Sequence, residues 1–279
     1  MGSIIAIHSY KGGTGKTLLS VNLAAIYAKR GRNICLFDLD FRAPSLHAAF
    51  KAEGNGYWLN DYLNGTCDVK KVLIELNPSH KESGRLFVGL ANPATEAIRE
   101  MSAKDRKWEM RALGRLLSLK NSLFNDVHVD HVIFDTSPGL QYSSINAIVS
   151  ADVAVVVSSL DASDIKGTQR MTRELYDLFE KKTGIVINKV PAGILSTQDK
   201  KEKLLKELRA IHNIPIIDVI PCFCEVLEAG GTYIFAAERP EHPFTMILNG
   251  VATKIESLTS NSFQHVHADT CNDAKIEQF

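Results

Sequence analysis

SIIAIHSYKGGTGKT, residues 3–17, joins a short apolar run to a glycine-rich segment that ends in Lys16-Thr17. This order predicts a strand, a loop and the first turn of a helix, in which backbone N–H groups and the helix N-terminus surround phosphate oxygens. Glycine in the loop lets the backbone approach an anion closely. We therefore expect the phosphates of a nucleotide to bind at Gly12, Gly13, Thr14, Gly15, Lys16, Thr17 and Leu18.

Two lysines stand in this loop, although a phosphate-binding loop needs only one. Lys16 is expected to reach the β- and γ-phosphates, and the Thr17 hydroxyl is expected to ligate Mg²⁺. The usual pattern has glycine five residues before Gly15, where this chain has Tyr10. Lys11, next to Tyr10, has no role that a single phosphate loop supplies.

Short runs rich in Val, Ile and Leu recur along the chain, at 4–9, 33–38, 85–90, 131–135, 153–159, 184–189 and 216–220. They are nearly continuous rather than alternating, which is typical of strands buried on both faces. Amphipathic segments that predict helices lie at 16–30, 102–126, 163–182, 199–211 and 244–258. The alternation predicts an α/β fold, a doubly wound, mostly parallel sheet with helices on both faces, and the phosphate loop after the first strand makes it a fold of the P-loop NTPase type.

The composition limits the class of protein. Hydrophobic residues make up 45% of the chain and charged residues 23%, as in ordinary globular proteins. No linker or internal repeat divides the chain, so we expect one domain over 1–258. The remaining residues, 259–279, are polar and without periodicity, which predicts a loosely ordered tail.

Charge, cysteines and hydropathy bear on location and partners. Thirty-two basic and 32 acidic residues give a net charge of zero, so no global field draws the protein to nucleic acid. Five cysteines without a signal peptide indicate a cytoplasmic protein. No apolar run is long enough for a transmembrane segment, and the tail lacks the basic amphipathic pattern of a membrane-targeting helix.

Three carboxylates follow apolar runs, in FDLDFRAPSL (37–46) and VIFDTSPGL (132–140). Asp38 and Asp40 stand at a strand end, on the side of an open sheet where ligands bind. One of them can assist the Mg²⁺ shell and the other can position water, or both can cap a loop or the next helix. Asp135 fits a Walker-B-type carboxylate that binds Mg²⁺ directly or through water.

VINKV, residues 186–190, bears on the choice of base. Asn188-Lys189 is the start of a guanine-reading motif, but such a motif needs a carboxylate three residues after the asparagine. Pro191 stands there, so adenine is the better inference, with the Asn188 side-chain oxygen facing the exocyclic amine.

Taken together, these motifs resemble the deviant-loop ATPases of the ParA and MinD family over residues 3–258, and Phe41-Arg42-Ala43-Pro44 places the resemblance in the MinD-like branch. The resemblance implies ATP and Mg²⁺ as ligands and a homodimer that forms around ATP. It also implies the residue roles. Lys11 crosses to the partner's phosphates, Asp38 lies near the outer shell of the metal, and Asp40 orients or activates the attacking water.

The remaining implications concern the second switch, the base and the output. Residues 137–139 are similar to the family's second switch, and a loop at 221–223 that begins with Pro221 would flank the adenine. The implied function is a slow ATPase, stimulated by a partner protein, that acts as a molecular switch. Its output would be the spatial organisation or partitioning of DNA or another cargo.

Two alternatives and one surface stay open. Cys222 and Cys224 could bind a soft metal ion between two subunits, as in an ATP-dependent metallochaperone that delivers a metal or an iron–sulfur cluster. A non-catalytic nucleotide-binding scaffold is the second alternative. Basic residues in 98–121 could bind DNA non-specifically or contact a partner, or they could form the solvated face of an amphipathic helix, whereas 199–211 is typical of a core-facing helix.

Overall fold

The strand that precedes the phosphate loop lies near the middle of the sheet. The computed structural model describes residues 2–52, 54–76, 84–176, 179–231 and 233–260. Within them, an eight-stranded sheet has the order β3-β4-β2-β5-β1-β6-β7-β8. The strands are β1 (Ser3–His8), β2 (Ile34–Leu39), β3 (Leu73–Leu76), β4 (Leu86–Gly89), β5 (His131–Thr136), β6 (Val153–Ser158), β7 (Lys182–Val190) and β8 (Ile216–Pro221).

All the strands are parallel except β3, which pairs antiparallel with β4 at one edge of the sheet. Each run that the sequence predicted as a strand forms one, so the predicted parallel sheet is confirmed. The strand β3 was missed because its four residues, LIEL, are short and only partly buried.

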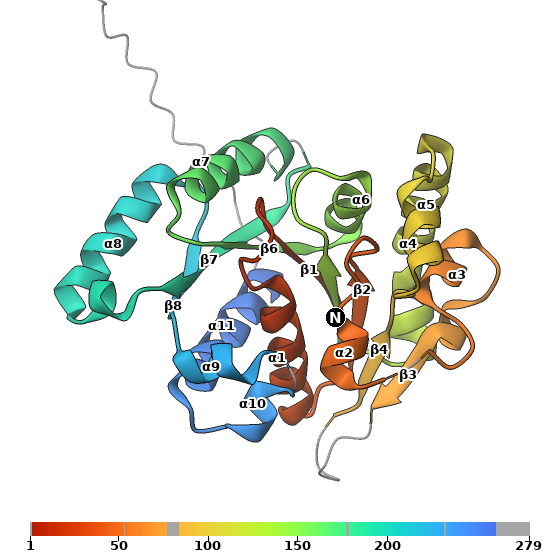
Figure 1. Cartoon of the computed structure of the whole chain (residues 1–279), viewed down its shortest axis with the longest axis horizontal. Coiled ribbons are helices and arrows are strands. Elements are labelled where there is room, and N and C mark those ends of the chain that lie inside the picture. The colour runs from red at the N-terminus through yellow and green to blue at the C-terminus, as the bar shows by residue number, and fades with distance from the viewer. Residues whose placement is uncertain (1, 53, 77–83, 177–178, 232, 261–279) are drawn as a thin grey trace, which may run out of the picture.

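Helices cover both faces of this sheet (Figure 1). They are α1 (Lys16–Lys29), α2 (Leu46–Phe50), α3 (Leu59–Asn64), α4 (Thr95–Ser102), α5 (Arg106–Lys120), α6 (Tyr142–Ser150), α7 (Ala162–Met171), α8 (Gln198–Ile211), α9 (Cys224–Ala229), α10 (Phe235–Glu238) and α11 (Pro243–Ser260). None of the helices in the described part of the chain has both the length and the apolar character needed to span a membrane.

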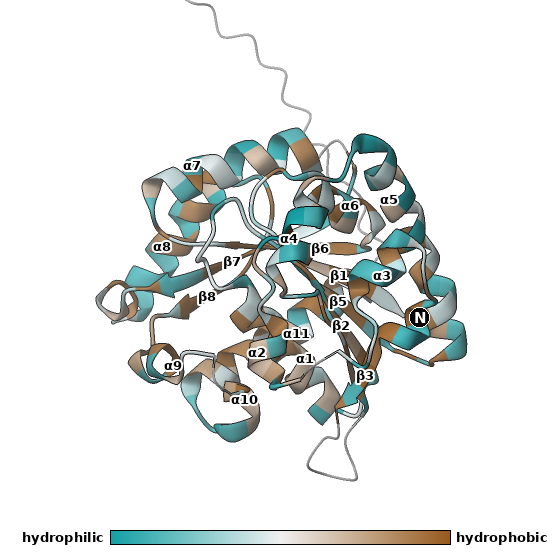
Figure 2. Cartoon of the chain, turned by 45° about the vertical axis from the view of Figure 1, so that its right-hand side comes forward, coloured by the Kyte–Doolittle hydropathy of each residue, from teal (hydrophilic) through white to brown (hydrophobic). Residues whose placement is uncertain are grey.

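Two hydrophobic cores lie on the two faces, because successive side chains of a strand point to opposite sides. In β1, Ile4 and Ala6 join one core, with side chains of α5, α6 and α7, whereas Ile5 and Ile7 join the other, with α1 and α11. Figure 2 shows the consequence: the strands of the central sheet are largely brown, and outer helices such as α4 are largely teal. The doubly wound architecture is therefore confirmed.

Two helix boundaries differ from the prediction. The helix predicted at 102–126 begins later, as α5 at Arg106, because the Asp105 side chain accepts a hydrogen bond from Trp108 N (2.7 Å) and caps the helix start; a π-helical turn at Asn121–Asp126 follows α5. The helix predicted at 163–182 is too long, since a π-helical turn at Thr172–Tyr176 follows α7 and β7 begins at Lys182. The helix predicted at 244–258 is α11. The division into a domain at 1–258 and a tail stays a prediction, and residues 261–279 lie outside the described residues.

Parallel pairing brings the predicted functional carboxylates together at the carboxyl ends of neighbouring strands. Asp38 of β2 is the register partner of Asp135 of β5, and Ile7 of β1 pairs with Asp135 from the other side. From β1 the chain continues to β2 on one side of the sheet, beyond β5, whereas β6 to β8 lie on the other side of β1. The strand order therefore reverses at β1, and the loop after β1 lies where open α/β sheets bind ligands.

Candidate functional site

The phosphate loop connects β1 to α1 and depends on glycine at two positions. Gly13 (φ 76°) and Gly15 (φ 101°) have left-handed backbone conformations, which residues with a side chain rarely adopt. A Cβ atom on Gly15 would also collide with the Asn188 side chain. The loop therefore has the conformation and the small side chains that close approach to phosphate requires.

The end of β7 holds the loop from one side. Asn188 Nδ2 donates to the carbonyl of Thr14 (2.8 Å), and Lys189 Nζ donates to that of Gly13 (2.8 Å). This role of Asn188-Lys189 as a support for the loop was not predicted. The predicted adenine contact of Asn188 stays a prediction, since the bond to Thr14 uses the amide nitrogen and not the oxygen.

Lys16 lies inside the site. Its side chain is 7% exposed, and its ammonium group donates to the hydroxyl of Ser9 (3.0 Å). Burial lowers the pKa of Lys16, although the charges of Asp135, Asp40 and Asp164 oppose this effect. Among the described residues, the side-chain hydrogen-bond partner of this ammonium group is the neutral Ser9, so its charge is not paired with a carboxylate by a hydrogen bond.

Thr17 and two carboxylates form the part of the site that was predicted for a metal. Thr17 Oγ1 donates to Asp135 Oδ2 (2.6 Å), and Ser20 Oγ lies 3.0 Å from the other oxygen of the same carboxylate. Asp38 accepts backbone hydrogen bonds from Asp40, Ser45 and Leu46. The structure therefore brings together Thr17, Asp38 and Asp135, and their role as metal ligands stays a prediction.

The electrostatics of the two carboxylates indicate a place for a cation. Burial raises the pKa of Asp38 to about 8, and the nearby charge of Asp135 adds to the rise. Burial likewise raises the pKa of Asp135 to about 6, against hydrogen bonds from Thr17 and Ser20 and the charge of Lys16. Two buried carboxylates and a hydroxyl are the hard oxygen donors that Mg²⁺ prefers, so these residues fit the expected metal.

A cavity of about 440 Å³ opens beside the loop. Its lining includes most of the predicted phosphate-binding residues, together with residues of the two loops that follow β2 and β5: Gly12, Gly13, Gly15, Lys16, Thr17, Leu18, Asp40, Arg42, Ala43, Pro138 and Gln141. Thr14 is buried next to it, and its hydroxyl has no hydrogen-bond partner within the described residues. The phosphate loop, Lys16, the Thr14 hydroxyl and the cavity therefore fit a nucleoside triphosphate.

Asp40 lies at the edge of this cavity and is held by the loop that follows β5. Ser137 Oγ donates to Asp40 Oδ1 (2.7 Å), and the same oxygen accepts a bond from Ala43 N (3.3 Å). The other carboxylate oxygen of Asp40 accepts no hydrogen bond from the described residues. Asp40 is thus held at the edge of the cavity, and its role in orienting water stays a prediction.

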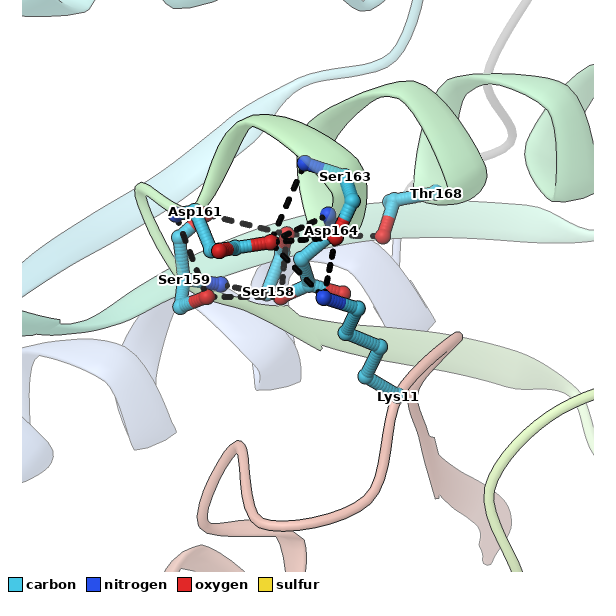
Figure 3. Close-up of polar contacts among 7 residues, drawn as sticks. All are labelled: Lys11, Ser158, Ser159, Asp161, Ser163, Asp164 and Thr168. Carbon is cyan, nitrogen blue, oxygen red and sulfur yellow. Dashed lines mark hydrogen bonds and ion pairs between the residues drawn. The ribbon is translucent and has the colours of Figure 1, made fainter.

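Lys11 differs from Lys16 in exposure and in its hydrogen-bond partners. Its side chain is 42% exposed and reaches away from the loop to the start of α7 (Figure 3), where its ammonium group pairs with Asp161 (2.8 Å) and contacts Ser163. The hydrogen bond from Lys11 holds the pKa of Asp161 well below its usual range. Within one chain Lys11 is therefore a surface residue tied to a neighbouring helix.

Several of these partners were missed from the sequence, although local signals existed. Ser20 lies one helical turn after Lys16, on the side of α1 that faces β5. Asp161 caps α7 by accepting from the backbone of Ser163 and Asp164, a pattern that LDASD (160–164) favours. Asp164 is buried and accepts a bond from Ser159 N (2.7 Å), which fixes the first turn of α7 (Figure 3).

The remaining predicted residues lie at the end of β8. Pro221 ends this strand and is half-buried, and the next residue, Cys222, donates its backbone N–H to Val190 at the end of β7 (2.8 Å). Cys222 is half-buried, and Cys224 is exposed at the start of α9. In the described ranges of a single chain, no group of three or more His, Cys, Asp or Glu side chains could hold a metal ion.

Comparisons with known proteins indicate the same class of ligand. The model of the CobQ/CobB/MinD/ParA nucleotide binding domain matches residues 5–233. The chain is 27% identical over 257 residues to an uncharacterized ATP-binding protein of Methanocaldococcus jannaschii, with 91% of this chain and 88% of the relative covered. It is 28% identical over 240 residues to the septum site-determining protein MinD of Thermotoga maritima, with 84% and 80% covered.

A solved structure supports the fold. The MinD protein of Pyrococcus horikoshii OT3, complexed with Mg-ADP, superposes with a TM-score of 0.72 and 20% sequence identity. The superposition covers 93% of this chain and 98% of that protein. The eight-stranded, mostly parallel sheet is thus shared with a nucleotide-binding protein over nearly its whole length.

Proposed function

Because the chain belongs to the CobQ/CobB/MinD/ParA nucleotide-binding family, and is an ATPase with ATP and Mg²⁺ as its ligands, we propose that it is a molecular switch that dimerises around ATP. The observation that carries this proposal is the contrast between the two lysines of one loop. Lys16 is buried and faces its own cavity, whereas Lys11 is exposed at the rim and has no contact with that cavity within its own chain. A second copy of the chain would give Lys11 a phosphate to contact.

Apolar side chains around the cavity support a face-to-face dimer. Leu140 and Tyr142 are 49% and 58% exposed, and they flank Gln141, which lines the cavity. Tyr10, directly before Lys11, is also exposed. Large exposed apolar side chains that surround a polar cavity are typical of a surface that is covered in a complex.

The residues then have distinct roles in hydrolysis. Lys16 and the loop N–H groups hold the β- and γ-phosphates, and Lys11 of the second copy adds positive charge where negative charge develops. Asp40, held by Ser137, orients the attacking water and accepts its proton. Thr17, Asp38 and Asp135 would hold Mg²⁺, which screens the phosphate charge when bound.

Release of the dimer would follow hydrolysis, because the contact between Lys11 and the partner's nucleotide weakens when the γ-phosphate leaves. Lys11 then returns to Asp161 and Ser163 of its own chain. This change couples the nucleotide state to the affinity for a partner protein. We propose that the output is the spatial organisation or partitioning of DNA or another cargo in the cytoplasm, controlled by an activating protein.

The other predicted functions have less support. A non-catalytic scaffold disagrees with membership of an ATPase family, and Cys222 and Cys224 bring no further metal-binding side chains together in the described part of one chain. The basic segments form α4, α5 and α8, which bury apolar residues such as Trp108, Leu116 and Leu208 and expose their charges, as solvated helix faces do. Non-specific DNA binding stays a prediction.

The test is the oligomeric state of the wild type with ADP, with ATP and with a non-hydrolysable ATP analogue, measured by light scattering after size exclusion. We expect a monomer with ADP and a dimer with ATP or the analogue. Lys11→Ala should weaken the analogue-dependent dimer at least about tenfold, which corresponds to about 1.4 kcal/mol, while the affinity of the monomer for ADP stays unchanged.

Lys203→Ala is the matched control, because Lys203 is an exposed lysine on α8. It should dimerise like the wild type. A Lys11→Ala protein that dimerises and hydrolyses ATP normally would show that the switch does not depend on a lysine supplied across the interface.

A further inference from the structure

Gly139, in the loop after β5, has both of its backbone groups bound to the strand that carries the phosphate loop. Its N–H donates to the carbonyl of Ser9 (2.9 Å), and its carbonyl lies 2.9 Å from His8 Nε2. The backbone of Gly139 is left-handed (φ 77°), so a side chain here would be strained. The loop is therefore fixed to β1 at this residue, and one of the two bonds comes from a side chain, that of His8.

The environment of His8 defines which of its nitrogens carries the proton. The ring is fully buried, and burial together with the charge of Lys16 lowers its pKa to about 3, so the imidazole is neutral. A neutral imidazole has a single N–H, and the carbonyl of Gly139 can only accept a hydrogen bond. The proton is thus on Nε2, and His8 donates to Gly139. Its Nδ1 has no hydrogen-bond partner in the described residues.

Two residues before Gly139, the same loop holds the carboxylate at the edge of the cavity. Ser137 Oγ donates to Asp40 Oδ1 (2.7 Å), and Pro138, between Ser137 and Gly139, lines the cavity itself. The position of Asp40 relative to the cavity therefore depends on residues 137–139. Asp40 has one other anchor on this oxygen, the longer bond from Ala43 N (3.3 Å).

We propose that His8 is a positioning residue for ATP hydrolysis, which fixes the loop at 137–139 through Gly139 so that Ser137 holds Asp40 in place. This inference rests on the proposed role of Asp40 in orienting water. His8 does not line the cavity, so it acts through Gly139 and Ser137 and not on the nucleotide. Loss of its N–H should affect the chemical step much more than nucleotide binding, because the loop Gly12–Lys16 keeps its supports from Asn188 and Lys189.

A purely structural role for His8 makes a different prediction. The ring packs near Tyr176, with ring centroids 6.3 Å apart, so an apolar residue of similar size could fill the same space. If packing alone mattered, such a residue would preserve hydrolysis, and a residue that keeps an N–H donor would have no advantage.

The experiment compares His8→Leu, which removes the donor, with His8→Gln, which keeps one. Steady-state hydrolysis gives kcat and KM, and a fluorescent ADP analogue gives the nucleotide affinity. We expect kcat of His8→Leu to fall at least about tenfold, since a small misplacement of a reacting group costs that much or more, while KM and the ADP affinity change less than about twofold. His8→Gln should retain most of kcat.

Amide hydrogen exchange of the nucleotide-free protein provides a measurement that is independent of activity. The N–H of Gly139 and its neighbours should exchange faster in His8→Leu than in the wild type or in His8→Gln. If His8→Leu does not fold, His8→Met, which also lacks an N–H donor, replaces it and should lose kcat to the extent expected of His8→Leu.

The inference is wrong if the two His8 variants lose kcat equally, if neither loses it, or if nucleotide affinity falls in parallel with kcat. These outcomes are distinct from a failure of the proposed function, which would appear in the wild type as absent ATP-dependent dimerisation. A wild type that dimerises and hydrolyses ATP, beside a fully active His8→Leu variant, would overturn only the role of His8.

Discussion

Two lysines five residues apart occupy opposite environments, and this difference decides how each can be used. Lys16 is buried, and burial lowers its pKa, so a phosphate that approaches it meets a cation that is only slightly exposed to solvent and is therefore weakly screened. Lys11 is solvated and its pKa is raised by Asp161, so it stays charged while it exchanges one anionic partner for another. An exposed pair of this kind contributes little to stability, which keeps Lys11 available for a stronger site.

Asp40 carries the clearest single-residue prediction. Asp40→Ala removes the group proposed to orient and deprotonate water, but leaves the loop and Lys16 intact. We expect phosphate release to fall about a hundredfold or more, with ATP binding within about twofold of the wild type. Phosphate release and equilibrium binding of a fluorescent ATP analogue measure the two quantities.

Asp130→Ala serves as the control for the loss of a carboxylate remote from the cavity. Asp130 accepts a bond from Asn33 N (2.7 Å) at the opposite ends of the strands. Its substitution should affect stability and not the rate of hydrolysis. Equal losses of hydrolysis in both variants would contradict a specific role for Asp40.

At the scale of elements, α7 is the helix that contacts the start of the phosphate loop most directly. Its first turn binds Lys11 through Asp161 and Ser163, and one turn further the ring of Tyr10 lies against Gly167, where a Cβ atom would overlap it. Tyr10 replaces a glycine of the usual loop pattern, and Gly167 provides the space that this ring occupies. The large residue at 10 and the small residue at 167 are therefore complementary.

Gly167→Ala should force the Tyr10 ring out of this space and destabilise the protein by about 1–3 kcal/mol, although alanine favours helices. Urea unfolding measures this free energy. Tyr10→Ala in the same chain should restore most of the loss, because the overlap disappears. If the double variant is as unstable as Gly167→Ala alone, the two residues do not interact as described.

The sequence was sufficient for the elements that depend on local pattern. Continuous apolar runs identified every parallel strand, and glycines followed by Lys16-Thr17 identified the loop. The sequence was insufficient for features that depend on contacts between segments far apart in the chain. The strand β3 forms only because β4 offers it an edge, and the support of the loop by Asn188 and Lys189 joins residues more than 170 positions apart.

For the molecule as a whole, nucleotide and metal should act as stabilisers, since the site joins β1, β2, β5 and α1. A ligand at 100 times its dissociation constant adds about 2.7 kcal/mol to the free energy of unfolding. We expect ADP with Mg²⁺ to raise the thermal midpoint, and EDTA to remove most of this increase, because without a cation nothing neutralises the negative charge of the phosphates beside that of Asp135.

Scanning calorimetry measures the midpoint. GDP with Mg²⁺ is the comparison for the base and should raise the midpoint less than ADP does. The Lys16→Ala variant should show no response to either nucleotide. Equal shifts with ADP and GDP would contradict the choice of adenine, and a full shift in EDTA would contradict the metal site.

The order of strands in the sheet also has a consequence for synthesis on the ribosome. The strand β1 is made first, but its two neighbours are β5 and β6, which end at Thr136 and Ser158. Pairing of strands so distant in the chain is slow, and it cannot begin before both partners have emerged. A nascent chain that stops before His131 therefore has the complete phosphate-loop sequence but neither neighbour of β1 nor Asp135, so ATP can favour the native fold only after β5 has been made.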